Sequence, residues 1–148
     1  MRFIGNPATG RMGGALAQAA AHRGANVTLV CGPTEVDLNV PGIEVVRVTS
    51  AAEMGAALGD RFPAAHWLIM AAAVADVRPA QSHVTKPAKS ELPDSLPLVF
   101  VPDFIAGLAR RKQPHQRAIG LAAQSRAFPA PSGDTLHAKG HDAVAAQP

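Results

Sequence analysis

The sequence predicts an α/β fold in which helices cover both faces of an open, mostly parallel, Rossmann-like sheet. A small glycine-bearing loop, residues 6–13, leads into an alanine-rich helix that stops at Arg23-Gly24. Apolar strand-like runs then alternate with helix-like segments, as in sheets built from βα units. The chain has 148 residues, which is the size of one domain, so we predict a single nucleotide-binding domain over residues 1–148.

The first half of the chain contains two predicted strands and a predicted helix. Short apolar runs predict strands at residues 26–30 and 44–48, with the turn-rich segment 32–42 between them. Ser50 and Glu53 have the spacing of a capping box, in which each residue satisfies a free N–H group at the helix start. A helix is therefore expected from this point to about residue 61.

The second half continues the alternation. The continuous apolar run at residues 67–72 predicts a strand that is covered on both faces, and residues 97–100 form a weaker strand pattern. Asp103 can cap a helix that extends to about residue 110. The remaining expected elements are a strand at 118–121, a loop at 128–135, a short helix at 136–139 and a last strand at 141–145.

Composition narrows the classes of function. The formal charge is +3, the basic residues are scattered apart from Arg110-Arg111-Lys112, and the chain has five Phe, one Trp and no Tyr. This leaves little surface for stacking on bases, so nucleic-acid binding is not expected. No run approaches the roughly 18 apolar residues of a membrane span. Cys31 is the single cysteine, so no internal disulfide can form, and we expect a cytoplasmic protein in which Cys31 is a buried structural thiol.

Ligands of open parallel sheets bind at the carboxyl ends of the strands, and three segments of the chain fall there. In the first, Thr9, Gly10 and Gly13 precede the alanine-rich helix. Glycine lets the backbone approach an anion, and the free N–H groups of a helix start can point at a phosphate. The alternative is a plain loop before a surface helix.

The second segment, residues 71–79, leaves the apolar strand with small residues and then presents Asp76 and Arg78. Small residues suit a flat ligand that lies against backbone. Asp76 could accept a hydrogen bond from a ribose hydroxyl or hold a metal through water. The alternative is a turn in which Asp76 and Arg78 form a pair.

The third segment, residues 85–90, contains Lys86 and Lys89. These lysines could neutralise phosphates as point charges, or they could belong to a solvated loop, and spacing alone does not choose between the two. The six histidines show no convincing ligand spacing, so no zinc site is expected.

Taken residue by residue, these segments resemble phosphopantothenoylcysteine synthetase, the phosphopantothenate–cysteine ligase of coenzyme A biosynthesis. Arg2-Phe3-Ile4-Gly5-Asn6 is similar to the family's Arg-Tyr-Ile-Ser-Asn, and Thr9-Gly10-Arg11-Met12-Gly13 to its Ser-Gly-Lys-Met-Gly. Ala72-Ala73-Val74-Ala75-Asp76, followed by Arg78-Pro79, matches its Ala-Ala-Val-Ala-Asp-Tyr-Arg-Pro. Further matches are Lys86 and Lys89 in a lysine loop, Pro102-Asp103 in Asn-Pro-Asp, Gly120-Leu121-Ala122-Ala123 in Gly-Phe-Ala-Ala, and Lys139-Gly140-His141-Asp142 in Lys-Gly-Leu-Asp.

The resemblance implies a two-step reaction. The carboxylate of 4′-phosphopantothenate attacks the α-phosphorus of CTP, which gives an acyl-cytidylate and pyrophosphate. The amine of L-cysteine then attacks this mixed anhydride and releases CMP. Mg²⁺ is implied with the triphosphate. In bacteria the family is commonly fused to a flavin-dependent phosphopantothenoylcysteine decarboxylase, so association with such a domain and a homodimer are expected, with no flavin bound by this chain.

The resemblance also implies residue roles. Asn6 would donate a hydrogen bond in the amide-forming step, with Arg2 nearby, and Lys86 would face the CTP phosphates. The implied nucleotide-binding residues are Ala72, Asp76, Lys86, Pro102, Asp103, Phe104, Leu121 and Lys139. The implied phosphate- or substrate-binding residues are Thr9, Gly10, Gly13 and Lys89.

The chain departs from the family pattern at several positions. Ala88 stands in the lysine loop, Val101 stands where the family has Asn, and Leu121 replaces an aromatic residue. Val77 replaces Tyr, and Gln124 replaces Glu. The match also begins at the Arg2 motif, without the family's first strand and its glycine loop, and it ends at the last strand. We therefore expect a chain truncated at both ends, with a bare strand edge or an unfilled slot in the sheet.

Two other functions fit parts of the pattern. A short-chain NAD(P)-dependent reductase shares the Thr9-Gly10 loop and the alanine-rich helix. However, Cys31-Gly32-Pro33 offers no acid for a ribose hydroxyl, and the chain has no Tyr to act as proton donor. A non-catalytic nucleotide-binding module would explain the departures, and binding of CTP without turnover would identify it.

Overall fold

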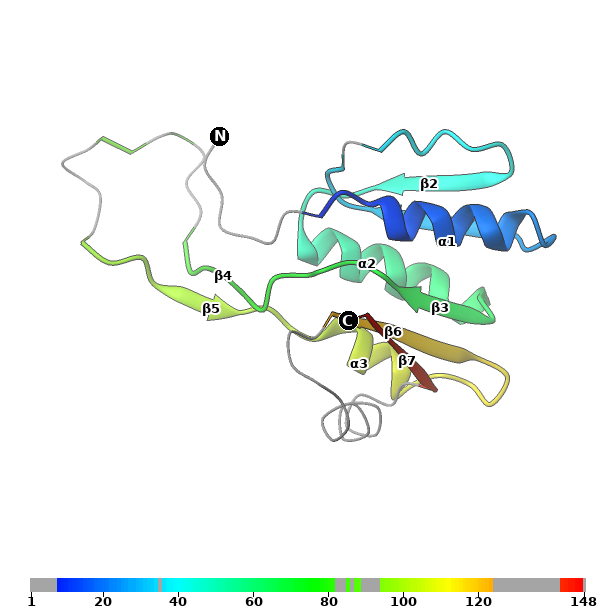
Figure 1. The fold of residues 1–148 in the computed structure, drawn as a ribbon. Helices are drawn as coiled ribbons and strands as arrows, with labels where there is room; N and C mark the ends of the chain where they lie inside the picture. Colours follow the sequence, from blue (N-terminus) through cyan, green and yellow to red (C-terminus); the bar gives the residue numbers. More distant parts are fainter. Residues whose placement is uncertain are drawn as a thin grey trace.

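The computed structural model describes residues 8–34, 36–81, 85, 87–88, 94–123 and 142–147. The chain forms an α/β body from which a thin two-stranded arm extends (Figure 1). The elements are α1 (Arg11–Ala21), β1 (Val27–Cys31), β2 (Ile43–Arg47), α2 (Ala51–Arg61), the 3-10 turn η1 (Phe62–Ala64), β3 (Trp67–Met70), β4 (Val77–Pro79), β5 (Leu98–Phe100), α3 (Phe104–Ala109), β6 (Arg117–Ala123) and β7 (Ala143–Gln147).

The body contains two parallel sheets, which confirms the predicted fold class. One pairs β1 with β2, and the other has the order β3-β6-β7, with every neighbouring pair parallel. Within the described ranges, β1 has no strand on its other side and neither does β3, so each presents an open edge. Residues 1–7, which precede α1, lie outside the described residues.

Helix α2 joins the two sheets through a shared core. Its buried residues Met54 and Ala57 pack with Val48, after β2, and with Met70, at the end of β3. Five partly buried residues, from β1, β2, α2, the loop after β3 and α3, surround this cluster: Val30, Val46, Leu58, Val74 and Ile105. Burial of the cluster against one helix aligns the two sheets, although no ladder connects them within the described residues.

The start of α2 confirms the capping box. The Ser50 hydroxyl oxygen accepts a hydrogen bond from the Glu53 N–H at 3.2 Å. The Glu53 carboxylate accepts hydrogen bonds from the backbone N–H and the hydroxyl of Thr49 at 2.8 and 3.0 Å. These bonds to Thr49, with smaller contributions from Ser50, lower the pKa of Glu53. The chain therefore enters α2 in one defined orientation.

The start of α1 differs from the prediction. The helix begins at Arg11, so Gly13 lies in its first turn and the preceding loop ends at Gly10. Gly10 has a φ of 77°, a left-handed conformation that favours glycine. The Gly14 N–H already donates to the Gly10 carbonyl at 2.9 Å. Gly14 fits in the first turn of α1 because it has no side chain to crowd its neighbour Leu38.

Strand β3 is covered on one face only, so the prediction that both faces are covered was wrong. Leu68 and Met70 are buried, whereas Trp67 and Ile69 are 60% and 40% exposed. Alternate residues of a strand point to opposite faces, and in the described part of the chain only the α2 face is covered. A continuous apolar run indicates that a strand could be buried on both faces. Whether each face is buried depends on elements from other parts of the chain.

Residues 77–79 form a strand that the sequence pattern did not reveal. β4 pairs antiparallel with β5, with Val77 opposite Phe100, and the two make the arm seen in Figure 1. The strand at the end of the described chain lies at Ala143–Gln147, two residues later than predicted. The loop and helix expected at 128–139 lie outside the described residues.

Among the helices that the structure does describe, none is both long and apolar enough to cross a membrane.

Candidate functional site

A cavity of about 220 Å³ lies where the arm joins the body. The loop after β3, the junction of β5 with α3, the middle of β6 and one face of α2 surround it. This is the carboxyl end of β3, where open parallel sheets place their ligands. Six residues that the resemblance assigns to nucleotide binding line it together: Ala72, Asp76, Pro102, Asp103, Phe104 and Leu121.

One wall is the small-residue loop that follows β3. Ala72 and Ala73 are exposed and have side chains of a single carbon, so a ligand can approach the backbone there. The carbonyl oxygen of Asp76 accepts a hydrogen bond from the Val101 N–H at 2.8 Å. This bond at the base of the arm holds the loop opposite the segment that leads into α3.

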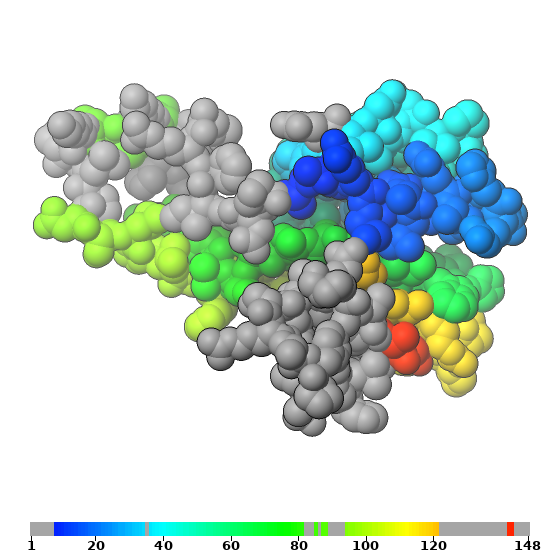
Figure 2. Space-filling view, in the orientation of Figure 1, coloured from blue at the N-terminus to red at the C-terminus, as the bar shows by residue number. Residues whose placement is uncertain are grey.

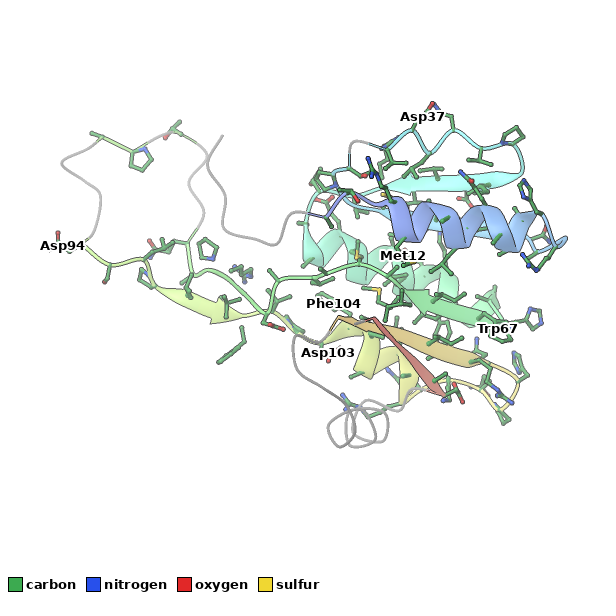
Figure 3. The ribbon with its side chains drawn as sticks, in the orientation of Figure 1. Met12, Asp37, Trp67, Asp94, Asp103 and Phe104 are labelled. Carbon is green, nitrogen blue, oxygen red and sulfur yellow. The ribbon has the colours of Figure 1, made fainter. Side chains whose placement is uncertain are left out.

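The opposite wall is the start of α3. Asp103 caps this helix, because its Oδ1 accepts a hydrogen bond from the Ala106 N–H at 3.0 Å. Figure 3 labels Asp103 and its neighbour Phe104 where the arm enters the body, while Trp67 lies at the far end of β3. The cap therefore orients the first residues of α3, Phe104 among them, at the edge of the cavity.

The floor of the cavity is apolar, and the sequence reasoning did not identify it as part of the site. Met54 and Leu58 of α2, Met70 at the end of β3 and Ile105 of α3 line it. Met54 and Leu58 are four residues apart and so lie on one face of the helix. This spacing marks an apolar helix face, but nothing in it separates a cavity floor from a filled core.

The described part of the predicted phosphate loop, residues 8–13, lies beside the cavity and does not line it. The Thr34 hydroxyl donates a hydrogen bond to the Thr9 carbonyl, and Thr9 Oγ1 accepts a long bond of 3.5 Å from the Arg11 N–H. A Cβ built on Gly13 would lie 3.8 Å from the Cβ of Ala71. The start of α1 is therefore adjacent to the residue that precedes Ala72 of the cavity.

Several predicted site residues lie outside the described residues, in three separate segments: Arg2 and Asn6, Lys86 and Lys89, and Lys139. The alternative of an Asp76–Arg78 pair is not observed, since the ion pairs of the described part are Arg61–Glu44 and Lys112–Asp142.

Cys31, at the end of β1, is half-buried. Burial raises the pKa of its thiol, and the nearby Arg47 partly offsets this rise. The thiol donates a hydrogen bond to the Gly32 carbonyl at 3.3 Å. A protonated thiol with a backbone partner is consistent with the structural role that was expected. Within the described ranges, no three His, Cys, Asp or Glu side chains gather in a way that could hold a metal ion.

The comparisons with known proteins point to one family. The family profile described as "DNA/pantothenate metabolism flavoprotein C-terminal domain" matches residues 1–148. The Coenzyme A biosynthesis bifunctional protein CoaBC of Mycobacterium tuberculosis is 44% identical over 131 residues, which cover 84% of this chain and 31% of that protein. The protein of the same name from Escherichia coli is 38% identical over 128 residues, with the same coverage of 84% and 31%.

A solved structure extends this similarity to three dimensions. The crystal structure of the C-terminal domain of Coenzyme A biosynthesis bifunctional protein CoaBC superposes with a TM-score of 0.84 at 31% sequence identity. The match covers 99% of this chain and 68% of that one. The chain thus spans less than a third of the full-length relatives and about two thirds of the solved domain.

Proposed function

Since the chain belongs to the family of DNA/pantothenate metabolism flavoprotein C-terminal domains, we propose that it acts in coenzyme A biosynthesis as a phosphopantothenate–cysteine ligase that uses CTP. The name of the relatives, Coenzyme A biosynthesis bifunctional protein CoaBC, supports a role in this pathway. The matches to the ligase motifs support the choice of phosphopantothenate, cysteine and CTP as substrates. The cavity at the carboxyl end of β3 is where the nucleotide would bind.

The observation that carries the proposal is the convergence of residues from separate segments on one cavity. Ala72 and Asp76 follow β3, Pro102 to Phe104 precede and open α3, and Leu121 lies in β6. The resemblance selected these residues without reference to their distance in space. Residues chosen only by a chance match of short motifs would not be expected to meet around one cavity.

The size of the cavity suggests which part of the nucleotide it would take. Complete small-molecule sites span roughly 300–1,000 Å³, and this cavity measures about 220 Å³. It would therefore hold the base and ribose, with Asp76 as acceptor for a ribose hydroxyl or the base. Backbone groups of residues 102–104 would meet the edge of the base. The triphosphate would extend out of the cavity, and the resemblance implies that Lys86, Lys89 and Lys139 bind it.

The reaction follows from charge and orientation. Lysine side chains on the phosphates would stabilise the negative charge that develops as the substrate carboxylate attacks the α-phosphorus and pyrophosphate departs. Asn6 would donate to the oxyanion that forms when the cysteine amine attacks the acyl-cytidylate and CMP leaves. Mg²⁺ bound with the triphosphate would supply further charge neutralisation. The exposed carboxylate of Asp76 is the oxygen ligand that this ion prefers, so the donor type fits.

Pyrophosphate release from the purified chain tests the proposal. CTP, Mg²⁺ and 4′-phosphopantothenate are supplied with and without cysteine. We expect pyrophosphate only when phosphopantothenate is present, and CMP only when cysteine is added as well. No release above a blank, in protein shown to be folded by circular dichroism, would contradict ligase activity of this chain.

Two cavity residues favour a second candidate, nucleotide binding without turnover. Val101 and Leu121 both line the cavity, and they stand where the family has Asn and an aromatic residue. Loss of a polar donor and of a stacking surface would impair the orientation of bound CTP more than its binding. CTP that binds in calorimetry with no pyrophosphate released would support this candidate over the ligase.

A further inference from the structure

We propose that Gly55 of α2 is a positioning residue that sets the location of the Phe104 ring and thereby the shape of the cavity. The inference rests on the proposed function, because Phe104 lines the cavity in which the nucleotide would bind. Neither the motif matches nor the capping pattern singled out Gly55.

The two residues touch so closely that only glycine fits. A Cβ added to Gly55 would lie 2.6 Å from Cδ1 of Phe104 and 2.8 Å from both Cε1 and Cγ. Carbon atoms in contact stay about 3.5–4.0 Å apart. The aromatic ring therefore lies directly against the backbone of α2 at this position.

The ring cannot absorb such a clash by a small rotation. Its three nearest atoms are consecutive carbons of a rigid ring, and the half-buried Phe104 follows the capping residue Asp103. Met54, next to Gly55 in sequence, lines the same cavity. A side chain at position 55 would therefore move the ring into the cavity or push α3 away from α2. Either movement changes the space between the cavity walls.

A second glycine of the same helix provides a contrast. Among the described residues, a Cβ on Gly59 would meet no atom within 4 Å. Neither residue has a positive φ, so the backbone of α2 does not itself require glycine at either position. Alanine is the better helix former, so Gly55 weakens α2 intrinsically. The contact with Phe104 gives a physical reason for glycine at position 55, and no such reason exists at position 59.

The test compares Gly55→Ala with Gly59→Ala, because the two substitutions change the same helix in the same way. CTP affinity is measured by calorimetry in the presence of Mg²⁺. We expect Gly55→Ala to weaken CTP binding about tenfold, at the lower end of typical overpacking costs. Gly59→Ala should bind like the parent. In turnover assays the KM for CTP should rise more than kcat falls.

A variant at Phe104 provides the decisive control. Phe104→Ala removes the ring, so adding Gly55→Ala to it should cause no further loss of affinity. A purely structural role of Gly55 in α2 would instead show the same loss in both backgrounds. The double variant also decides the question if Gly55→Ala alone does not fold, since removal of the ring should then restore folding. Equal CTP affinity of Gly55→Ala and Gly59→Ala would overturn the proposal.

Failure of the proposed function would be recognised separately. If the parent chain does not bind CTP, urea unfolding still tests the contact itself. Gly55→Ala should then be less stable than Gly59→Ala, and the difference should vanish in the Phe104→Ala background. Equal stabilities of the two glycine variants would overturn the packing relationship whatever the ligand is.

Discussion

The core beneath α2 and the β4–β5 arm both contain large apolar side chains, but these are buried to very different extents. In the core, Met54 and Met70 are less than 9% exposed, whereas Phe100 in the arm is 87% exposed. In the space-filling view, the arm extends well beyond the body of the molecule (Figure 2). Large apolar side chains are thus removed from water in one region and left in contact with it in the other.

The two regions meet at the cavity, and each supplies a different part of its lining. The core supplies the apolar floor through Met54, Leu58 and Met70. The base of the arm holds the walls together, because the Val101 N–H donates to the Asp76 carbonyl. The stability of the fold should therefore depend on the core, while the spacing of the cavity walls should depend on the arm.

The largest expected effect lies in the core. Met70→Ala should lower the free energy of unfolding by about 2–5 kcal/mol, because it removes a buried side chain of β3 that packs against α2. Urea unfolding followed by circular dichroism measures this loss. Ile69→Ala is the matched control, since Ile69 is the preceding residue and is 40% exposed. Its loss should stay within about 1 kcal/mol, and equal losses would contradict the one-sided burial of β3.

A buried amide should give the next largest effect. Gln116 is 2% exposed, and its Nε2 donates to the carbonyls of Phe62 and Ala65, each at 2.7 Å. Its Oε1 accepts from the Gln113 N–H at 2.8 Å. Gln116→Ala should cost roughly 2–3 kcal/mol, because it leaves buried polar groups without partners. Thermal unfolding measures this cost, and the exposed Gln113→Ala should have little effect by comparison.

Asp142 should make the stability of the sheet depend on pH. Its carboxylate accepts hydrogen bonds at 2.7 Å from the Lys112 ammonium and from the Ala118 N–H. The bond with Lys112, followed by that with Ala118, lowers the pKa of Asp142 in the folded chain. A lowered folded pKa means that the stabilisation is present above the unfolded value of about 3.9 and is lost as the pH falls below it.

The pH effect can be isolated with one substitution. The unfolding free energy of the parent and of Asp142→Asn is measured from pH 6 down to about pH 3. The difference between the two should shrink as the pH falls. A difference that stays constant over this range would mean that the carboxylate charge does not contribute to the anchoring of β7.

The smallest effect is expected in the arm. Phe100→Ser should change the unfolding free energy by no more than about 0.5 kcal/mol, because its ring is already in contact with solvent. It should also leave the unfolding midpoint of the body unchanged. A loss comparable with that of Met70→Ala would mean that another surface covers Phe100 in solution. Sedimentation of the parent chain would then test whether that surface is a second copy.

Local patterns predicted most of the elements. The Ser50 cap, the Asp103 cap and the apolar runs located α2, α3 and the parallel strands to within a few residues. β4 was missed because its three residues are too few to show an alternating pattern. The motif matches selected six residues that meet at one cavity, but they did not reveal its apolar floor or the contact between Gly55 and Phe104.

The sequence by itself determined the fold class, the starts of α2 and α3 and the small-residue segments, because these depend on neighbouring residues in the chain. The tertiary structure alone decided which face of β3 is buried, that residues 77–79 pair antiparallel with 98–100, and that α1 begins beside Ala71. These features depend on contacts between segments that are distant in sequence. Burial and close packing are properties of such contacts, and no local pattern records which segments will supply them.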